Sequence, residues 1–207
     1  MATGRTGGRN LLVTLPVAAF FTSLFFLCLL PAFPRALFLL GMCLGIVVGR
    51  ILANANVLRG NWAWIVVAWV AAQVLSMLVV GIVQLFSSDP AAAGWSNPPP
   101  LSPVALAAGG LMGALPIVGV LSLLRRTRFA FIIAQALLGM ACGGILAVVG
   151  WTLTPSLGTS LCQLLGPRNA IFGPRLPANL LFSMHLVWPT GMALVTALTV
   201  RDNSALR

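Results

Sequence analysis

Six long apolar runs, separated by short segments rich in proline, glycine or arginine, dominate the chain. A membrane-spanning helix needs about 20 mostly apolar residues, and no run carries a charge in its middle. Open strands cannot span lipid, because their backbone groups would lack hydrogen-bond partners. We therefore expect an all-α integral membrane protein, a bundle of six transmembrane helices in one polytopic domain, residues 1–207. The expected spans are 11–30, 36–52, 62–86, 103–124, 129–150 and 178–200, with outer loops at 87–102 and 151–177.

Composition excludes an ordinary soluble domain. Hydrophobic residues make up 59% of the chain and charged residues 7%, whereas soluble domains are about 25% charged. The net charge of +10 does not indicate nucleic acid, because the arginines lie singly or in short groups between apolar runs instead of on one solvated face. We expect the lipid bilayer as the chain's surroundings and no nucleic-acid partner.

The placement of arginine predicts the orientation. With the N-terminus in the cytoplasm, nine arginines lie inside and three (Arg35, Arg168 and Arg175) lie outside. The positive-inside rule then favours cytoplasmic N- and C-termini and an even number of spans, and we expect a bacterial inner (cytoplasmic) membrane. The first two runs could instead form a re-entrant hairpin, because only residues 31–35 separate them. The nine inner arginines are Arg5, Arg9, Arg50, Arg59, Arg125, Arg126, Arg128, Arg201 and Arg207.

A short internal sequence similarity relates the third and fifth runs. Residues 72–75 (Ala-Gln-Val-Leu) are similar to residues 134–137 (Ala-Gln-Ala-Leu), and each run follows a segment that bears arginine. Three pseudo-repeated hairpins are one interpretation, although chance resemblance is common in apolar sequence.

Catalytic constellations are missing from the sequence. It has no glutamate, and its two aspartates, Asp89 and Asp202, fall outside the expected spans. Carboxylates within the membrane are the usual ion-binding groups of coupled carriers. We therefore expect neither an enzyme nor a coupled transporter. His185, in the sixth run, is the sole histidine, so it could supply one axial ligand to haem or a pigment but could not build a metal site alone. The simpler interpretation is a hydrogen bond within the bundle, and the cofactor stays unassigned.

Two kinds of residue favour helix packing. Gln73 and Gln135 fall in mid-span, where an amide needs a partner; we favour interhelical hydrogen bonds over a pore lining. Glycines spaced by four residues allow close approach of backbones, within the bundle or with another subunit. These glycines are Gly41, Gly45 and Gly49 in the second run, Gly109 and Gly113 in the fourth, and Gly139 and Gly143 in the fifth.

Two loops carry a remote resemblance to aquaporin-type channels. Residues 54–56 (Asn-Ala-Asn) and 169–176, which include Asn169-Ala170 and Phe-Gly-Pro-Arg-Leu, are similar to the loops that hold that family's Asn-Pro-Ala motifs. Neither Asn-Pro-Ala is intact here, and the family's glutamates in spans one and four are missing. The resemblance implies a passive channel.

Three functions follow as hypotheses. We favour a non-catalytic transmembrane subunit that packs within a larger membrane complex or with itself, because the loops are short and the helices rich in glycine. The alternatives are a passive channel for a neutral or anionic small solute and a single-histidine pigment- or haem-binding protein.

Overall fold

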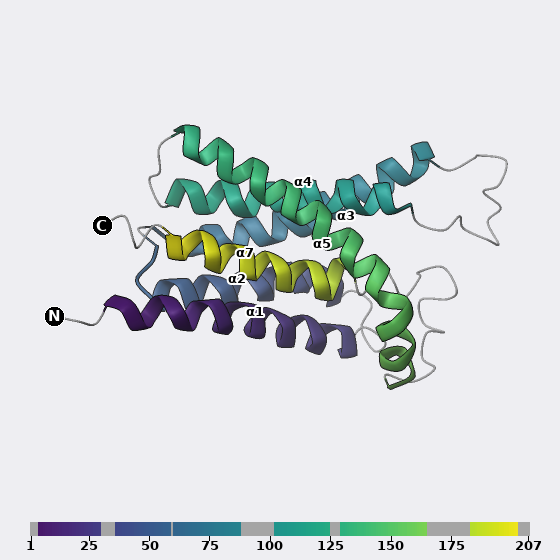
Figure 1. Cartoon of the computed structure of the whole chain (residues 1–207), viewed down its shortest axis with the longest axis horizontal. Coiled ribbons are helices and arrows are strands. Elements are labelled where there is room, and N and C mark those ends of the chain that lie inside the picture. Colours follow the sequence, from purple (N-terminus) through teal and green to yellow (C-terminus); the bar gives the residue numbers. More distant parts are fainter. Residues whose placement is uncertain are drawn as a thin grey trace.

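The computed structural model describes residues 4–29, 36–58, 60–87, 102–124, 129–164 and 183–202. These residues form helices joined by turns and contain no strand. Most of the expected outer loop 87–102 and the second part of the expected outer loop 151–177, residues 165–177, lie outside the described residues; residues 169–176 are among them. The elements are α1 (Gly4–Leu29), α2 (Ala36–Asn54), α3 (Ala63–Ser87), α4 (Pro103–Leu124), α5 (Phe129–Leu164), the π-helical turn η3 (Ser183–Val187) and α7 (Trp188–Asp202) (Figure 1).

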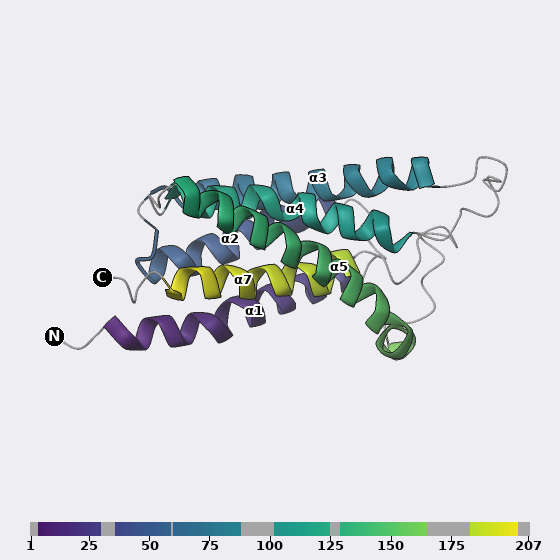
Figure 2. The same ribbon diagram turned by 45° about the horizontal axis from the view of Figure 1, so that its top comes forward.

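The helices form a closed ring. Each of α1, α2, α3, α4 and α5 contacts the next along the chain, and α7 closes the ring by contacting α5 and α1. The helix α7 also touches α4, and η3 packs on both α1 and α5. The start of α1 and the end of α7 lie at the same end of the bundle (Figures 1 and 2). The segment Ser183–Val200 is the most buried of the candidate membrane spans in the described residues.

Five helical segments are long and apolar enough to cross a membrane: Asn10–Leu27, Ala63–Phe86, Pro103–Leu124, Ile132–Leu153 and Ser183–Val200. The chain is therefore an all-helical integral membrane protein. In α2 the apolar stretch is shorter, Leu39–Asn54. Its 16 residues extend about 24 Å at 1.5 Å per residue, less than the ~30 Å hydrocarbon core. Of the six spans expected from the sequence, five correspond to helices long enough to cross a membrane, and the second corresponds to the shorter α2.

The fifth helix is longer than predicted. We expected it to end at 150, but α5 continues to Leu164, and its last turns bend away from the direction of its first part (Figures 1 and 2). Pro155 lies within this final part. A proline inside a helix removes one backbone hydrogen bond and clashes with the preceding turn, which kinks the helix without ending it. Residues 151–164, expected as part of an outer loop, are therefore a bent extension of α5.

Side chains fix the starts of two helices. The Asn61 side-chain oxygen accepts a hydrogen bond from the Ala63 backbone N–H at 2.9 Å and caps α3. The Ser102 backbone N–H donates to Gln84 Oε1 at 2.9 Å, which ties the start of α4 to α3. Pro103, the first residue of α4, has no N–H to leave unpaired. These contacts explain why α4 begins at Pro103.

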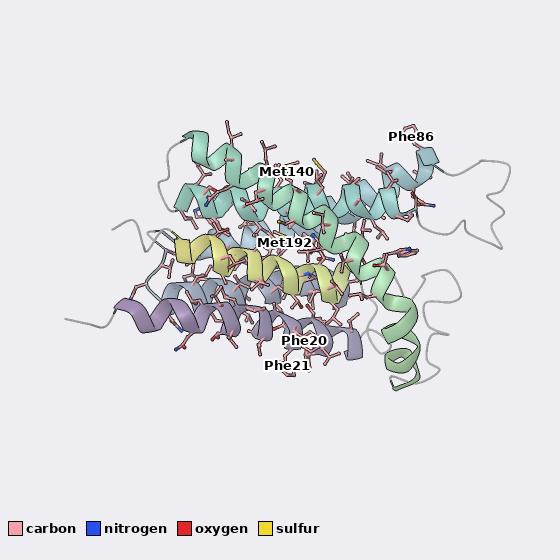
Figure 3. All side chains as sticks on the ribbon, viewed as in Figure 1. Phe20, Phe21, Phe86, Met140 and Met192 are labelled. Atoms are coloured by element: carbon pink, nitrogen blue, oxygen red, sulfur yellow. The ribbon has the colours of Figure 1, made fainter. Side chains whose placement is uncertain are left out.

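Large apolar side chains cover the outside of the bundle. Phe86 at the end of α3 and Phe21 on α1 are exposed by 88% and 63%, and both point away from the bundle in Figure 3. Met192 of α7, by contrast, is fully buried. An apolar outer surface of this extent is unusual for a soluble monomer and matches a chain surrounded by lipid.

Candidate functional site

A buried polar centre lies where η3 meets α3. His185, on η3, is completely buried, and its Nδ1 lies 3.0 Å from the side-chain nitrogen of Gln73 on α3. An amide nitrogen can only donate, so this contact is a hydrogen bond in the imidazole tautomer that accepts on Nδ1 and has its proton on Nε2. That Nε2 has no hydrogen-bond partner among the described residues. The structure thus joins two of the three polar residues that the sequence placed in mid-membrane.

Two buried tryptophans, which the sequence analysis did not single out, lie on the same helix faces as Gln73 and His185. Trp69 and Trp188 are each 1% exposed, and their rings meet edge to face with centroids 6.2 Å apart. The Trp188 Nε1–H donates to the carbonyl of Gly110 at 3.1 Å, which links α7 to α4. Their spacing was an available signal: Trp69 precedes Gln73 by four residues, and Trp188 follows His185 by three, so each pair shares a helix face.

Hydroxyl groups extend the polar centre along the bundle. Ser183 Oγ donates to the carbonyl of Ala147, joining η3 to α5. Ser76, one turn beyond Gln73 on α3, is buried against Gly109 and Gly113 of α4. Several buried polar atoms have no partner among the described residues, and such groups are uncommon in native proteins. They are Ser23 Oγ, Trp69 Nε1, Ser76 Oγ, His185 Nε2 and Thr196 Oγ1.

The glycines of α2 face α3. A Cβ built on Gly45 would lie 2.5 Å from the Cα of Val66, and one on Gly41 would lie 3.0 Å from the carbonyl oxygen of Trp69. Gly49 adjoins the ring of Trp62. Real Cβ atoms essentially never come within 3.0 Å of a backbone atom, so only glycine fits at Gly45. This stripe packs inside the chain and is not available to a second subunit.

The glycines of α4 and α5 also face inward. Gly110, which the sequence analysis did not select, meets Gly143, and a Cβ on Gly110 would lie 2.5 Å from the Gly143 carbonyl oxygen. Gly109 and Gly113 lie against α3, and Gly139 against Val118 of α4. All seven glycines selected from the sequence therefore adjoin a neighbouring helix of the same chain.

Gln135, the third mid-membrane polar residue, bonds elsewhere. Its Oε1 accepts a hydrogen bond from Ser122 Oγ at 3.1 Å, which joins α5 to α4. Gln135 and Gln73 thus occupy similar sequence contexts but have different partners. Both amides hydrogen-bond across helices.

The described residues hold no group of three or more His, Cys, Asp or Glu side chains that could bind a metal ion. A single axial ligand needs a lone pair on the imidazole nitrogen that faces the metal. The tautomer that accepts the Gln73 bond on Nδ1 has a proton on Nε2, so ligation through Nε2 requires the other tautomer and a turned Gln73 amide. An axial ligand at His185 would therefore replace the present hydrogen bond between Gln73 and His185.

The region with remote aquaporin-like sequence is a tight connection. The helix α2 ends at Asn54, and a turn with Asn56 at φ 53° leads within a few residues to the cap of α3. The described residues between Asn54 and Ala63 form no half-helix like those that hold the Asn-Pro-Ala motifs. The counterpart at 169–176 lies outside the described residues.

Comparison with known proteins gives no family for this chain: no family model, curated protein or solved structure matches it. The fold and the composition define its class. It is a polytopic, all-helical integral membrane protein with a closely packed, partly polar interior.

Proposed function

We propose that the chain is a non-catalytic transmembrane subunit whose interior is structural and whose outer faces contact lipid and other membrane subunits. Its arginine-bearing end faces the cytoplasm, α2 crosses with the other five helices, and the membrane is a bacterial inner membrane. The nine-to-three arginine distribution supports this orientation. The common placement of the start of α1 and the end of α7 fits six crossings.

The main support for this proposal is that polar side chains in the middle of the spans form hydrogen bonds between helices. Gln73 bonds His185, Gln135 bonds Ser122, and Trp188 bonds the Gly110 carbonyl, each between different helices. Such bonds contribute about 0.6–2 kcal/mol each to helix association in membranes. Two buried indole rings fill the space beside them. An interior arranged in this way holds helices together and leaves the outer faces for contact with partners.

Because the glycine stripes are used internally, the partner surface must consist of the large apolar side chains. The outer half of α3 is the most exposed helix face, with Leu78, Ile82, Leu85 and Phe86 between 45% and 88% exposed. Neither α2 nor α4 covers this face. We assign the contact with a neighbouring subunit to it.

Site-specific cross-linking tests this assignment. A photoactivatable phenylalanine analogue at position 85 should form one discrete adduct with a membrane protein in native membranes. The same analogue at position 44 should form none, because Leu44 is fully buried. Position 21 on α1, exposed by 63%, is the matched exposed control. A subunit role would be contradicted if positions 85 and 21 both cross-linked to lipid alone or to many proteins without one discrete adduct.

A passive channel for a small neutral solute is the second candidate, and a different observation favours it. Five buried polar atoms inside the ring have no partner among the described residues. Intramembrane polar groups often mark a solute path. Buried water would satisfy the same atoms, and the two large tryptophan rings are themselves buried in the bundle and touch each other. We therefore favour the structural interpretation of the interior.

A further inference from the structure

The corner between α2 and α3 holds an exposed arginine that packs on a tryptophan ring. Arg50, one turn before the end of α2, is exposed, and its guanidinium carbon lies 5.1 Å from the centroid of the Trp62 ring. Gly49 makes this possible, because a Cβ there would lie 3.0 Å from Cε3 of Trp62. The indole therefore lies close to α2, directly below the arginine side chain.

A cation–π contact of this kind holds the guanidinium beside the indole without using its N–H groups. Those N–H groups can donate hydrogen bonds to a phosphate. Arg50 has no ion pair or hydrogen bond through its side chain to any described residue. Its hydrogen-bonding capacity is therefore available to a ligand.

The corner lies at the level of lipid headgroups. The apolar stretch of α2 ends at Asn54, and the spanning part of α3 begins at Ala63. Trp64, in the first turn of α3, is 57% exposed. Exposed indoles at helix ends occupy the membrane–water interface, with the ring beside the headgroups. The Arg50 guanidinium is thus placed where a lipid phosphate would be.

Further positive charge gathers at the same end of the bundle. The first turns of α1 contain Arg5 and Arg9, and the last turn of α7 contains Arg201. The start of α1, the end of α7 and the α2–α3 corner all lie at the same end of the bundle (Figures 1 and 2). The one acidic residue in these helix ends is Asp202. Such a charge distribution attracts anions and repels cations.

We propose that this corner is a binding site for an anionic phospholipid, whose phosphate accepts hydrogen bonds from Arg50 while the glycerol region lies against Trp62 and Trp64. The excess of arginine selects anionic over zwitterionic headgroups. The apolar outer face of the bundle below the corner accommodates the acyl chains. This site is independent of whether the chain acts as a subunit or as a channel.

Lipid exchange in nanodiscs tests the proposal. The purified full chain is placed in phosphatidylcholine nanodiscs containing a graded fraction of phosphatidylglycerol, and lipid retained by the protein is counted by native mass spectrometry. The wild type should retain phosphatidylglycerol in preference to phosphatidylcholine. Arg50→Gln should weaken that retention about fivefold, the effect of one arginine at a charged surface. Trp62→Leu should weaken it as well, although Arg50 is still present.

Arg9→Gln is the matched control, because it removes the same charge from the same end of the bundle. It should change retention by less than about twofold. If Arg50→Gln and Arg9→Gln reduced phosphatidylglycerol retention equally, the lipid would be held by the overall positive charge of this end of the bundle and not by a site at the corner. That result would overturn the proposal. Displacement of the lipid by millimolar inorganic phosphate would assign the corner to a free anion instead, and equal retention of the two lipids would also refute it.

Discussion

Gly45→Leu should prevent formation of a stable bundle, whereas Gly81→Leu should be tolerated. A Cβ on Gly45 would lie 2.5 Å from the Cα of Val66, a backbone atom that cannot move without separating α2 from α3. Overpacking of this kind typically costs about 1–3 kcal/mol, and a whole leucine side chain enlarges the clash. A Cβ on Gly81 would meet nothing within 4 Å, so both substitutions remove a helix glycine but only one blocks a contact.

Thermal unfolding in detergent measures this difference. We expect Gly45→Leu to aggregate on extraction or to lower the melting temperature by about 2–12 °C, since each kcal/mol corresponds to about 2–4 °C in a chain of this size. The melting temperature of Gly45→Ala should lie between those of Gly45→Leu and the wild type. Similar melting temperatures for the leucine variants at 45 and 81 would show that α2 does not pack closely on α3.

Trp188→Ala should be the most damaging substitution in the centre of the bundle. The indole is 1% exposed, donates a hydrogen bond to the Gly110 carbonyl and meets Trp69 edge to face. Removing it leaves a cavity and loses the hydrogen bond between α7 and α4, with an expected loss on the order of 3 kcal/mol. Trp64→Ala is the matched control, because Trp64 is 57% exposed and its loss should cost less than about 1 kcal/mol.

Denaturant-induced unfolding of the two tryptophan variants checks this prediction. A third variant, Trp188→Phe, keeps most of the ring but lacks the N–H donor, so it separates packing from hydrogen bonding. We expect its stability to lie between those of the wild type and Trp188→Ala. Equal stabilities of Trp188→Ala and Trp64→Ala would place the Trp188 ring outside the core.

The sequence predicts the helices well because lipid imposes a length on them. The fourth span, 103–124, coincides with α4, where a proline starts the helix and a basic segment follows it. The third agrees with α3 to within one residue at each end. The helix α5 continues past the expected fifth span, 129–150, because a helix can continue through a proline such as Pro155 with a bend; its candidate membrane span is Ile132–Leu153.

Partners are harder to predict than helices. Four-residue spacing of glycines indicates close approach of two helices but does not say which helix approaches. The α2 stripe could have faced another subunit, and it faces α3. Gln73 and Gln135 likewise each required a hydrogen-bond partner, but the register of neighbouring helices selects His185 for one and Ser122 for the other.

The central claim is that the polar interior holds helices together and conducts nothing. The purified chain is reconstituted in liposomes under an imposed proton or sodium gradient, and entry of small neutral and anionic solutes is followed by stopped-flow light scattering and tracer uptake. We predict the same rates as in protein-free liposomes, because no carboxylate lies within the described spans and the two tryptophans fill the centre. Solute entry above that level, reduced in Gln73→Leu or His185→Leu while the variants stay folded, would contradict the claim and assign these residues to a path.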